Sequence, residues 1–334
     1  MKNSRGGTRL TTRDSVAARA GVSSATVSRV YNNPSSVSSE KRRAVLEAAE
    51  ALGYYPNKAA SALRRDGSGI ITLAEFKKDD RDYYWADLSL FKWFFADVVH
   101  AVRDVVEPTM FQLNLAVIKS PSDLESLKGR TDGLICFDVD RESEAEMISR
   151  SSIPYVIGHH TAAFASHLSC STDNFHGGGL QAQLLIERGS RRPAYISAHI
   201  DDVAPNRERY LGFRAAFGKT DVRLIETSVS SEAGRIAAES LMPDIKAGRI
   251  DGIAAVNDIT AAGAAAALEA AGVRVQKDIP LAGYDAMPFA AAPPFKLLSV
   301  DLRPAAIYRE AALSMLEYLS GNRSLKSKII KPVV

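Results

Sequence analysis

The chain has 334 residues, enough for two or three folded domains, and 46% of them are apolar, an ordinary share for a folded protein. It contains no run of about 18 apolar residues, which excludes a membrane-spanning helix. Its amino terminus lacks the apolar segment of a secretory signal, so we expect a cytoplasmic protein. The two cysteines, Cys136 and Cys170, have no CxxC spacing, which argues against a disulfide framework or a zinc site.

The net charge of +3 hides an asymmetry between two parts of the chain. Residues 1–66 hold 12 of the 42 lysines and arginines and 5 of the 39 acidic residues, which gives +7 there and −4 in the remainder. A small basic module on a larger acidic body is typical of proteins that bind a polyanion. A basic tail that is merely solvated would give the same numbers, so charge alone leaves both interpretations open.

Three short helices are predicted near the amino terminus, over residues 13–20, 24–31 and 39–52. Each follows a residue that caps helices well, namely Thr12, Ser23 and Ser38. Gly21 separates the first two helices, and glycine adopts the positive φ of a tight turn at little cost. Apolar residues recur where two helices would face each other: Val16, Ala17, Val27 and Val30. This spacing predicts a helix-turn-helix module.

Beyond a polar linker over residues 54–68, short apolar strands alternate with helices. The predicted strands are 70–74, 112–118, 133–137, 155–157, 193–196, 223–226, 252–255 and 281–282, with a last strand within 329–334. The predicted helices are 94–106, 177–188, 208–217, 233–245, 259–271 and 305–319. Such alternation predicts parallel sheets with helices on both faces. The segment is longer than one such sheet requires, so we expect two lobes.

The segment Ala20-Gly21-Val22-Ser23-Ser24-Ala25-Thr26-Val27-Ser28-Arg29-Val30-Tyr31-Asn32 resembles the recognition segment of the lactose/galactose repressor family. The match continues through Val37-Ser38, Leu52-Gly53-Tyr54 and Pro56-Asn57, and the resemblance covers nearly the whole chain. It implies an all-α helix-turn-helix head and an α/β two-lobed body like that of periplasmic binding proteins. The implied boundaries are 10–54 for the head, 55–68 for a hinge linker and 69–334 for the ligand-binding and dimerisation domain. Within that domain the first lobe would hold 69–189 and 299–319, and the second lobe 190–298 and 320–334.

The resemblance places the second helix in the major groove of DNA, with Ser24, Ala25 and Arg29 toward the base edges. Arg29 is the main candidate for reading sequence, because a guanidinium can bond O6 and N7 of one guanine together. The positions matching contacts to phosphate or sugar are Thr12, Ser23, Ser28, Asn32, Ser38, Tyr54 and Asn57. Ordinary helix capping or solvation explains each of these residues equally well.

The linker matches the family's hinge, which folds into a short helix on operator binding and enters the minor groove. Ala60 and Leu63 are the matching residues, and Leu63 would wedge open a central base step. A leucine that packs against the body fits the same position.

Several motifs match the family's effector cleft: Asp173-Asn174, Arg207-x-Arg209, Asn257-Asp258 and Gly283-Tyr284-Asp285. The implied effector-binding residues are Phe94, Phe95, Asp173, Arg209, Asn257 and Asp285. Arg209 can donate two parallel hydrogen bonds and Asp285 can accept from two hydroxyls, which suits a polyhydroxy ligand. A purely structural ion pair fits the same residues. The aromatic insert at 77–90 departs from the family pattern, and its role stays open.

These observations favour a ligand-responsive DNA-binding regulator, most simply a repressor, that binds a palindromic operator as a dimer. A sugar or sugar derivative is the expected effector, and a purine or nucleoside is the alternative. A sugar-metabolising enzyme is a further alternative. The sequence has no nucleophile elbow, no glycine-rich dinucleotide motif, no P-loop and no metal-ligand spacing, so we expect no enzyme activity, cofactor or metal.

Overall fold

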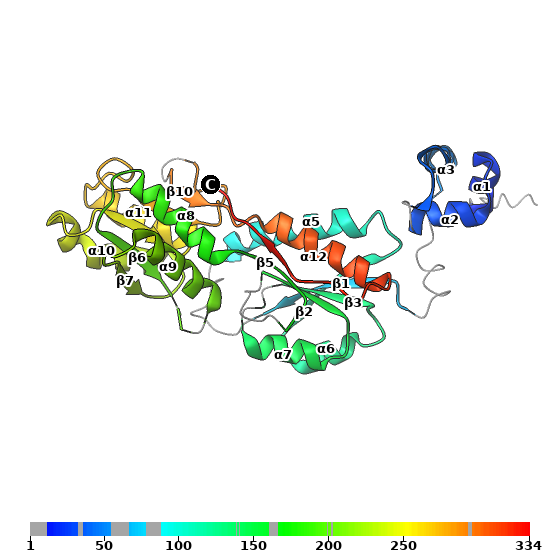
Figure 1. The fold of residues 1–334 in the computed structure, drawn as a ribbon, viewed down its shortest axis with the longest axis horizontal. Coiled ribbons are helices and arrows are strands. Elements are labelled where there is room, and N and C mark those ends of the chain that lie inside the picture. The colour runs from blue at the N-terminus through cyan, green and yellow to red at the C-terminus, as the bar shows by residue number, and fades with distance from the viewer. Residues whose placement is uncertain are drawn as a thin grey trace, which may run out of the picture.

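The computed structural model describes residues 12–32, 36–54, 67–77, 88–137, 139, 141–159, 166–198, 200–201, 203–292 and 296–334. A small helical head is followed by two α/β lobes (Figure 1). Within the described ranges, no helix combines the length and the apolarity that crossing a membrane requires.

The head consists of α1 (Arg13–Ala20), α2 (Ser24–Asn32) and α3 (Ser39–Ala51), close to the predicted bounds. Its core contains the predicted apolar residues together with three from α3: Val16, Ala17, Val27, Val30, Val45, Ala48 and Ala49. Gly21 ends α1 with φ of 65°, a left-handed conformation that turns the chain sharply into α2. The head therefore has the predicted helix-turn-helix form.

The first lobe is a six-stranded parallel sheet in the order β11-β5-β4-β3-β1-β2. Its strands are β1 (Ile70–Phe76), β2 (Gln112–Ile118), β3 (Gly133–Phe137), β4 (Tyr155–Gly158), β5 (Ser169–Thr172) and β11 (Lys328–Ile330). Helices α5 (Leu88–Val106) and α12 (Pro304–Leu319) cover one face, and α6 (Pro121–Leu127) and α7 (Glu142–Arg150) lie on the other (Figure 1).

The second lobe is a five-stranded parallel sheet in the order β10-β9-β8-β6-β7. Its strands are β6 (Pro193–Ser197), β7 (Arg223–Glu226), β8 (Gly252–Ala255), β9 (Leu281–Tyr284) and β10 (Leu298–Val300). Tyr195 packs toward α8 (Asn174–Ile186) and α9 (Ala204–Phe217), whereas its neighbours Ala194 and Ile196 pack toward α10 (Ser231–Lys246) and α11 (Asp258–Ala270). The alternation along β6 thus places helices on both faces, as predicted.

The lobe boundaries differ from those we expected at two places. Helix α8, expected in the first lobe, packs against α9 and the second sheet, so the chain first crosses between lobes at residues 172–174. Residues 320–334 were expected in the second lobe, but β11 pairs with β5 of the first, with Lys328 opposite Cys170. Both differences involve β5, which we did not predict as a strand. Its sequence is Ser-Cys-Ser-Thr, without the run of branched apolar residues that is typical of a buried strand.

Candidate DNA interface and effector site

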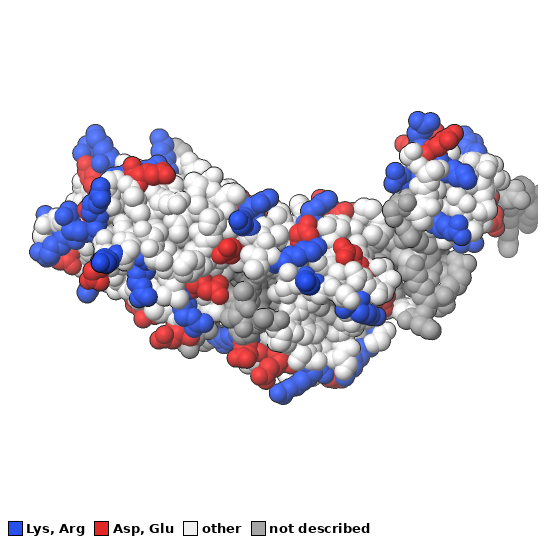
Figure 2. Space-filling model, in the orientation of Figure 1, with Lys and Arg blue, Asp and Glu red and all other residues white. Residues whose placement is uncertain are grey.

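Helix α2 presents one exposed and one buried face. Ala25 and Arg29 are exposed and lie four residues apart, on the same side of the helix, while Val27 and Val30 are buried in the head core. Ser24 is half-buried, and its hydroxyl donates a hydrogen bond to the carboxylate of Asp14. Ala25 and Arg29 are therefore available to a ligand on this face, whereas Ser24 already has an internal partner. Lys and Arg side chains are prominent on the visible surface of the head (Figure 2).

Two of the predicted DNA-backbone residues cap helices. The hydroxyl of Thr12 accepts from the N–H of Ser15 at 3.3 Å, and that of Ser23 accepts from the N–H of Thr26 at 3.1 Å. Ser38 precedes α3 without a capping hydrogen bond from its side chain, and Tyr54 contacts the ring of Tyr31. Ser28 is half-buried on α2. The side chain of Asn32 and residues Asn57, Ala60 and Leu63 lie outside the described residues.

Arg209 is the centre of a buried polar cluster in the second lobe. Its side chain is 1% exposed, and Nε donates to Oδ1 of Asn174 at 3.0 Å. One terminal nitrogen, Nη1, donates to the carbonyl of Val256 at 3.0 Å and lies 3.8 Å from Oδ1 of Asp285. The guanidinium carbon stands 3.8 Å from the centre of the Tyr284 ring. Arg209 thus joins α9, the start of α8 and the carboxyl ends of β8 and β9, where parallel sheets bind ligands.

Asp285 lies in a turn that L-residues rarely adopt, with φ of 100°, and Ala286 follows with φ of 49°. Burial raises the pKa of Asp285 to about 7, because the nearby guanidinium of Arg209 offsets only part of the cost of burying the charge. Burial also raises the pKa of Asp258 well above its usual range, and the charge of Asp285 adds to that shift. The charge of Asp301 adds to the upward shift in the pKa of Asp285.

The two remaining polar candidates are helix N-caps. Oδ1 of Asp173 accepts from the N–H of His176 at 2.9 Å at the start of α8, and Oδ1 of Asn257 accepts from the N–H of Thr260 at 2.9 Å at the start of α11. Both helices begin at the carboxyl ends of strands, which places these two caps on the same side of the sheets as Asp285.

The aromatic candidates are in the first lobe. Phe94 and Phe95 lie on α5, with their ring centres 5.8 and 5.6 Å from that of Phe137, the last residue of β3. The ring of Tyr308 on α12 also packs against Phe137, with the two ring centres 5.5 Å apart. Phe94 is 5% exposed, so it belongs largely to the core. The aromatic group and the Arg209 cluster therefore come from different lobes.

Glycines allow α8 and α9 to cross in direct backbone contact. A Cβ on Gly178 would stand 1.9 Å from the carbonyl oxygen of Arg209, and one on Gly212 would stand 1.9 Å from that of Phe175. This close approach positions Arg209 beside Asn174. The glycine at 178 is thus explained by helix packing, whereas a Cβ on Gly179 would meet nothing closer than 3.9 Å.

Sequence reasoning missed Asn174, Tyr284 and Asp258 as parts of the site. Each of them stands beside a residue that was selected, within the Asp173-Asn174, Asn257-Asp258 and Tyr284-Asp285 pairs, so the motifs themselves carried the signal. No group of three or more histidine, cysteine or acidic side chains suited to a metal ion occurs in the part of the chain that the structure describes.

Comparison with known proteins matches both parts of the chain. Residues 12–57 match the model for bacterial regulatory proteins of the lacI family, and residues 182–334 match the periplasmic binding protein-like domain. The HTH-type transcriptional regulator CelR of Thermobifida fusca is 30% identical over 337 residues, covering 96% of each protein. The ribose operon repressor of Halalkalibacterium halodurans is 31% identical over 291 residues, 84% of this chain and 81% of that repressor.

Solved structures show the same architecture. A complex of the transcriptional regulator CelR with cellobiose has a TM-score of 0.67 and 27% identity, and the match covers 96% of this chain and 97% of that one. The Lac repressor dimer bound to operator and the anti-inducer ONPF has a TM-score of 0.66 over 97% of each chain; at 20% identity it supports the fold alone. The identity with CelR over nearly the full length, together with the matched head and body, shows that this chain belongs to the lacI family of bacterial transcriptional regulators.

Proposed function

We propose that this regulator is a cytoplasmic repressor that binds a palindromic operator as a dimer, under the control of a sugar or sugar derivative bound between its lobes. The observation that carries the effector assignment is the buried pairing of Arg209 with Asp285. A guanidinium and a carboxylate held together at the carboxyl ends of strands offer donors and acceptors to adjacent hydroxyls of one ring.

For DNA, the proposal assigns base reading to Arg29 and Ala25, with Ser24 beside them. The exposed face of α2 supports this assignment, since a recognition helix needs a face free of the head core. Thr12, Ser23, Ser28, Asn32, Ser38, Tyr54 and Asn57 are proposed to contact the DNA backbone. Ala60 and Leu63 are proposed to enter the minor groove between the two half-sites.

For the effector, the proposal assigns polar contacts to Arg209, Asp285, Asp173 and Asn257, and an aromatic wall to Phe94 and Phe95. The structure of CelR in complex with cellobiose supports a carbohydrate. The HTH-type transcriptional repressor PurR of Mannheimia succiniciproducens, another relative, keeps a purine as the second candidate, and the half-buried ring of Phe95 suits stacking on either kind of ring.

Control of DNA binding would follow from the arrangement of the lobes. The chain passes between them at 172–174 and at 300–304, and Val333, beyond β11, pairs with Asp301 in the second of these passages. The lobes can therefore change their relative angle without unfolding either sheet. A ligand that contacts both the aromatic group and the Arg209 cluster binds one arrangement better than the other. It shifts the population by that difference in affinity and no more.

Two measurements test the proposed function. Selection of binding sites from random DNA should yield a motif with two-fold symmetry, and its absence would overturn the operator proposal. A thermal-shift screen with cellobiose, ribose, their phosphates and purines should reveal one stabilising class, since a ligand that binds only the folded state raises the melting temperature. Stabilisation by purines alone would favour the second candidate. Stabilisation that persists undiminished in Arg209→Gln would contradict the proposed site.

A further inference from the structure

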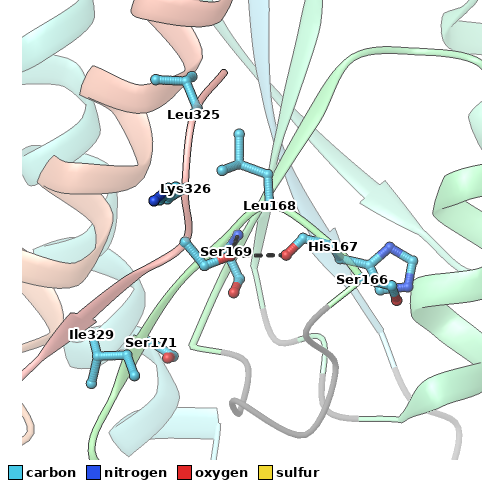
Figure 3. Close-up of a pocket in the computed structure, with 9 residues that line it drawn as sticks. Ser166, His167, Leu168, Ser169, Ser171, Leu325, Lys326 and Ile329 are labelled. Atoms are coloured by element: carbon cyan, nitrogen blue, oxygen red, sulfur yellow. Dashed lines mark hydrogen bonds between the residues drawn. The ribbon is translucent and has the colours of Figure 1, made fainter. Parts of the chain in front are cut away.

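The first lobe contains a pocket of about 450 Å³ that the proposed effector site does not use (Figure 3). Two segments far apart in the sequence form it: residues 166–171, which lead into and along β5, and residues 325–329, which lead into β11. A volume in this range is typical of sites for small molecules.

The pocket lies on the face of the sheet opposite α12. Along β5 and β11, Cys170 and Lys328 point toward α12, where Lys328 pairs with Glu310 at 2.8 Å. Side chains alternate along a strand, so Ser169, Ser171 and Ile329 point to the other face, and all three line the pocket. The sheet edge therefore separates the pocket from the Lys328–Glu310 pair.

Two serines of the pocket have hydroxyls that reach the pocket's solvent and make no hydrogen bond with a described residue. Ser169 is 4% exposed and Ser171 is 2% exposed. Neither hydroxyl makes a hydrogen bond with any residue that the structure describes. These hydroxyls are thus available to a bound molecule.

The remaining polar groups around the pocket favour an anion. Lys326 is exposed at its rim, and among the described residues no carboxylate lies within ion-pair distance of it. Nδ1 of His167 shares a hydrogen bond of 2.6 Å with the hydroxyl of Tyr155. This bond orients the imidazole ring and leaves Nε2 for a ligand. None of the described residues that line the pocket is acidic. The polar side chains of the pocket are thus a lysine, a histidine and serines, each of which can donate a hydrogen bond to an anion.

We propose that this pocket binds a small phosphorylated molecule, with its phosphoryl oxygens accepting hydrogen bonds from Ser169 and Ser171 and facing the ammonium of Lys326. Phosphoryl oxygens accept several charge-assisted hydrogen bonds at once, which matches two hydroxyls and a flexible lysine. The volume exceeds that of a phosphate ion and leaves room for an attached group along Leu168 and Ile329. The site is independent of the proposed effector site, because Ser169 starts β5 whereas Asp173 follows its carboxyl end.

The test uses the full chain with inorganic phosphate, glucose 6-phosphate and, as a neutral control, glucose. Phosphorus NMR titration and calorimetry should show one saturable site per chain for the two phosphorylated probes, weaker at high salt, and none for glucose. Lys326→Gln and Ser171→Val should each weaken binding by about tenfold, the usual effect of losing one charge-assisted hydrogen bond. Lys331→Gln is the matched control, since Lys331 is an exposed lysine of the same segment that does not line the pocket.

Several outcomes would overturn the proposal. One is the absence of saturable binding for both phosphorylated probes up to about 10 mM, well above the concentration at which a specific site fills. Another is equal binding by the wild type, Lys326→Gln and Ser171→Val. Loss of binding in Arg209→Gln with full binding in Lys326→Gln would place the phosphate between the lobes instead. If Ser171→Val fails to fold by circular dichroism, Lys326→Gln decides the question, because an exposed lysine is not part of the core.

Discussion

The hydroxyl of Ser299 donates a hydrogen bond of 2.7 Å to Oδ1 of Asp258 and accepts one of 3.0 Å from the N–H of Ala286. The second carboxylate oxygen of Asp258 accepts from the N–H of Met287 at 2.7 Å. Together these bonds fix the turn in which Asp285 and Ala286 have positive φ, a conformation that persists only when its surroundings hold it. Ser299 and Asp258 thus position Asp285 without being adjacent to it in the chain.

Ser299→Ala should lower the free energy of unfolding by about 1–3 kcal/mol, because it leaves a buried carboxylate oxygen and the N–H of Ala286 each with one partner fewer. Urea denaturation followed by circular dichroism measures this change. Ser149→Ala is the control, since that hydroxyl is exposed and bonds only within its own helix. Equal stability of the two variants would show that water replaces the Ser299 hydroxyl.

Asp285→Asn should flatten the dependence of stability on pH. A carboxyl whose pKa is raised from 3.8 to about 7 binds its proton more tightly in the folded state. Its contribution to stability is therefore present below the ordinary value and is lost as the pH rises toward 7, by at most about 1.4 kcal/mol per pH unit for one proton. The variant lacks this loss and also removes the charge that raises the pKa of Asp258. Urea denaturation at several pH values between the ordinary pKa of 3.8 and the raised value of about 7, the window in which the slope differs from zero, compares the wild type with the variant. A wild-type slope equal to that of the variant would contradict the raised pKa.

Gly178→Ala should destabilise the second lobe by about 1–3 kcal/mol or more, because the new methyl group would meet the backbone carbonyl of Arg209, which cannot rotate away. Gly179→Ala is a matched control in the next position, where the nearest atom to a Cβ is 3.9 Å away. That variant should be neutral or slightly stabilising, since alanine favours helix more than glycine does. Melting temperatures of the two variants, measured side by side, provide the comparison, and similar values would show that α8 and α9 separate easily.

Arg29→Ala should reduce affinity for the selected operator by about 1–3 kcal/mol and relax preference mainly at one base pair per half-site. Arg43→Ala serves as the control, because Arg43 is an exposed arginine on α3 that pairs with Glu47 on its own helix. Fluorescence anisotropy with operator and with random DNA measures both effects. An equal loss on the two DNAs would show that Arg29 contacts only phosphate.

The sequence predicted most of the fold because its elements follow strong local rules. Strands such as Gly133–Phe137 are continuous apolar runs, and helices such as α10 carry clear periodicity after a capping serine. Strand β5 was missed because Ser169 and Ser171 are polar, and their burial depends on tertiary packing that no local pattern encodes. Because β5 was missed, we expected the first boundary between the lobes at residue 189, whereas the structure has it near residue 173.

The site was predictable only as far as its motifs extend. Arg209 and Asp285 were selected from separate motifs, and the structure brings them to 3.8 Å. The Asp258–Ser299 pair joins residues 41 positions apart and depends on the neighbouring placement of β9 and β10, which the alternation of elements does not specify. Prediction from motifs therefore finds the residues of the site more readily than the groups that hold them in place.

The order in which the chain leaves the ribosome matters for a protein whose last strand completes its first sheet. Residues 174–300 contain all of the second lobe and emerge as one continuous stretch, so this lobe can fold during synthesis. The first lobe begins earlier but stays incomplete until α12 and β11 emerge, and until then β5 is an edge strand open to pairing with other chains. We expect a nascent chain arrested just after β10 to show a protease-resistant second lobe and a sensitive first lobe. Chaperones that shield exposed strand edges would then act late in synthesis, on the first-lobe residues that were synthesised early.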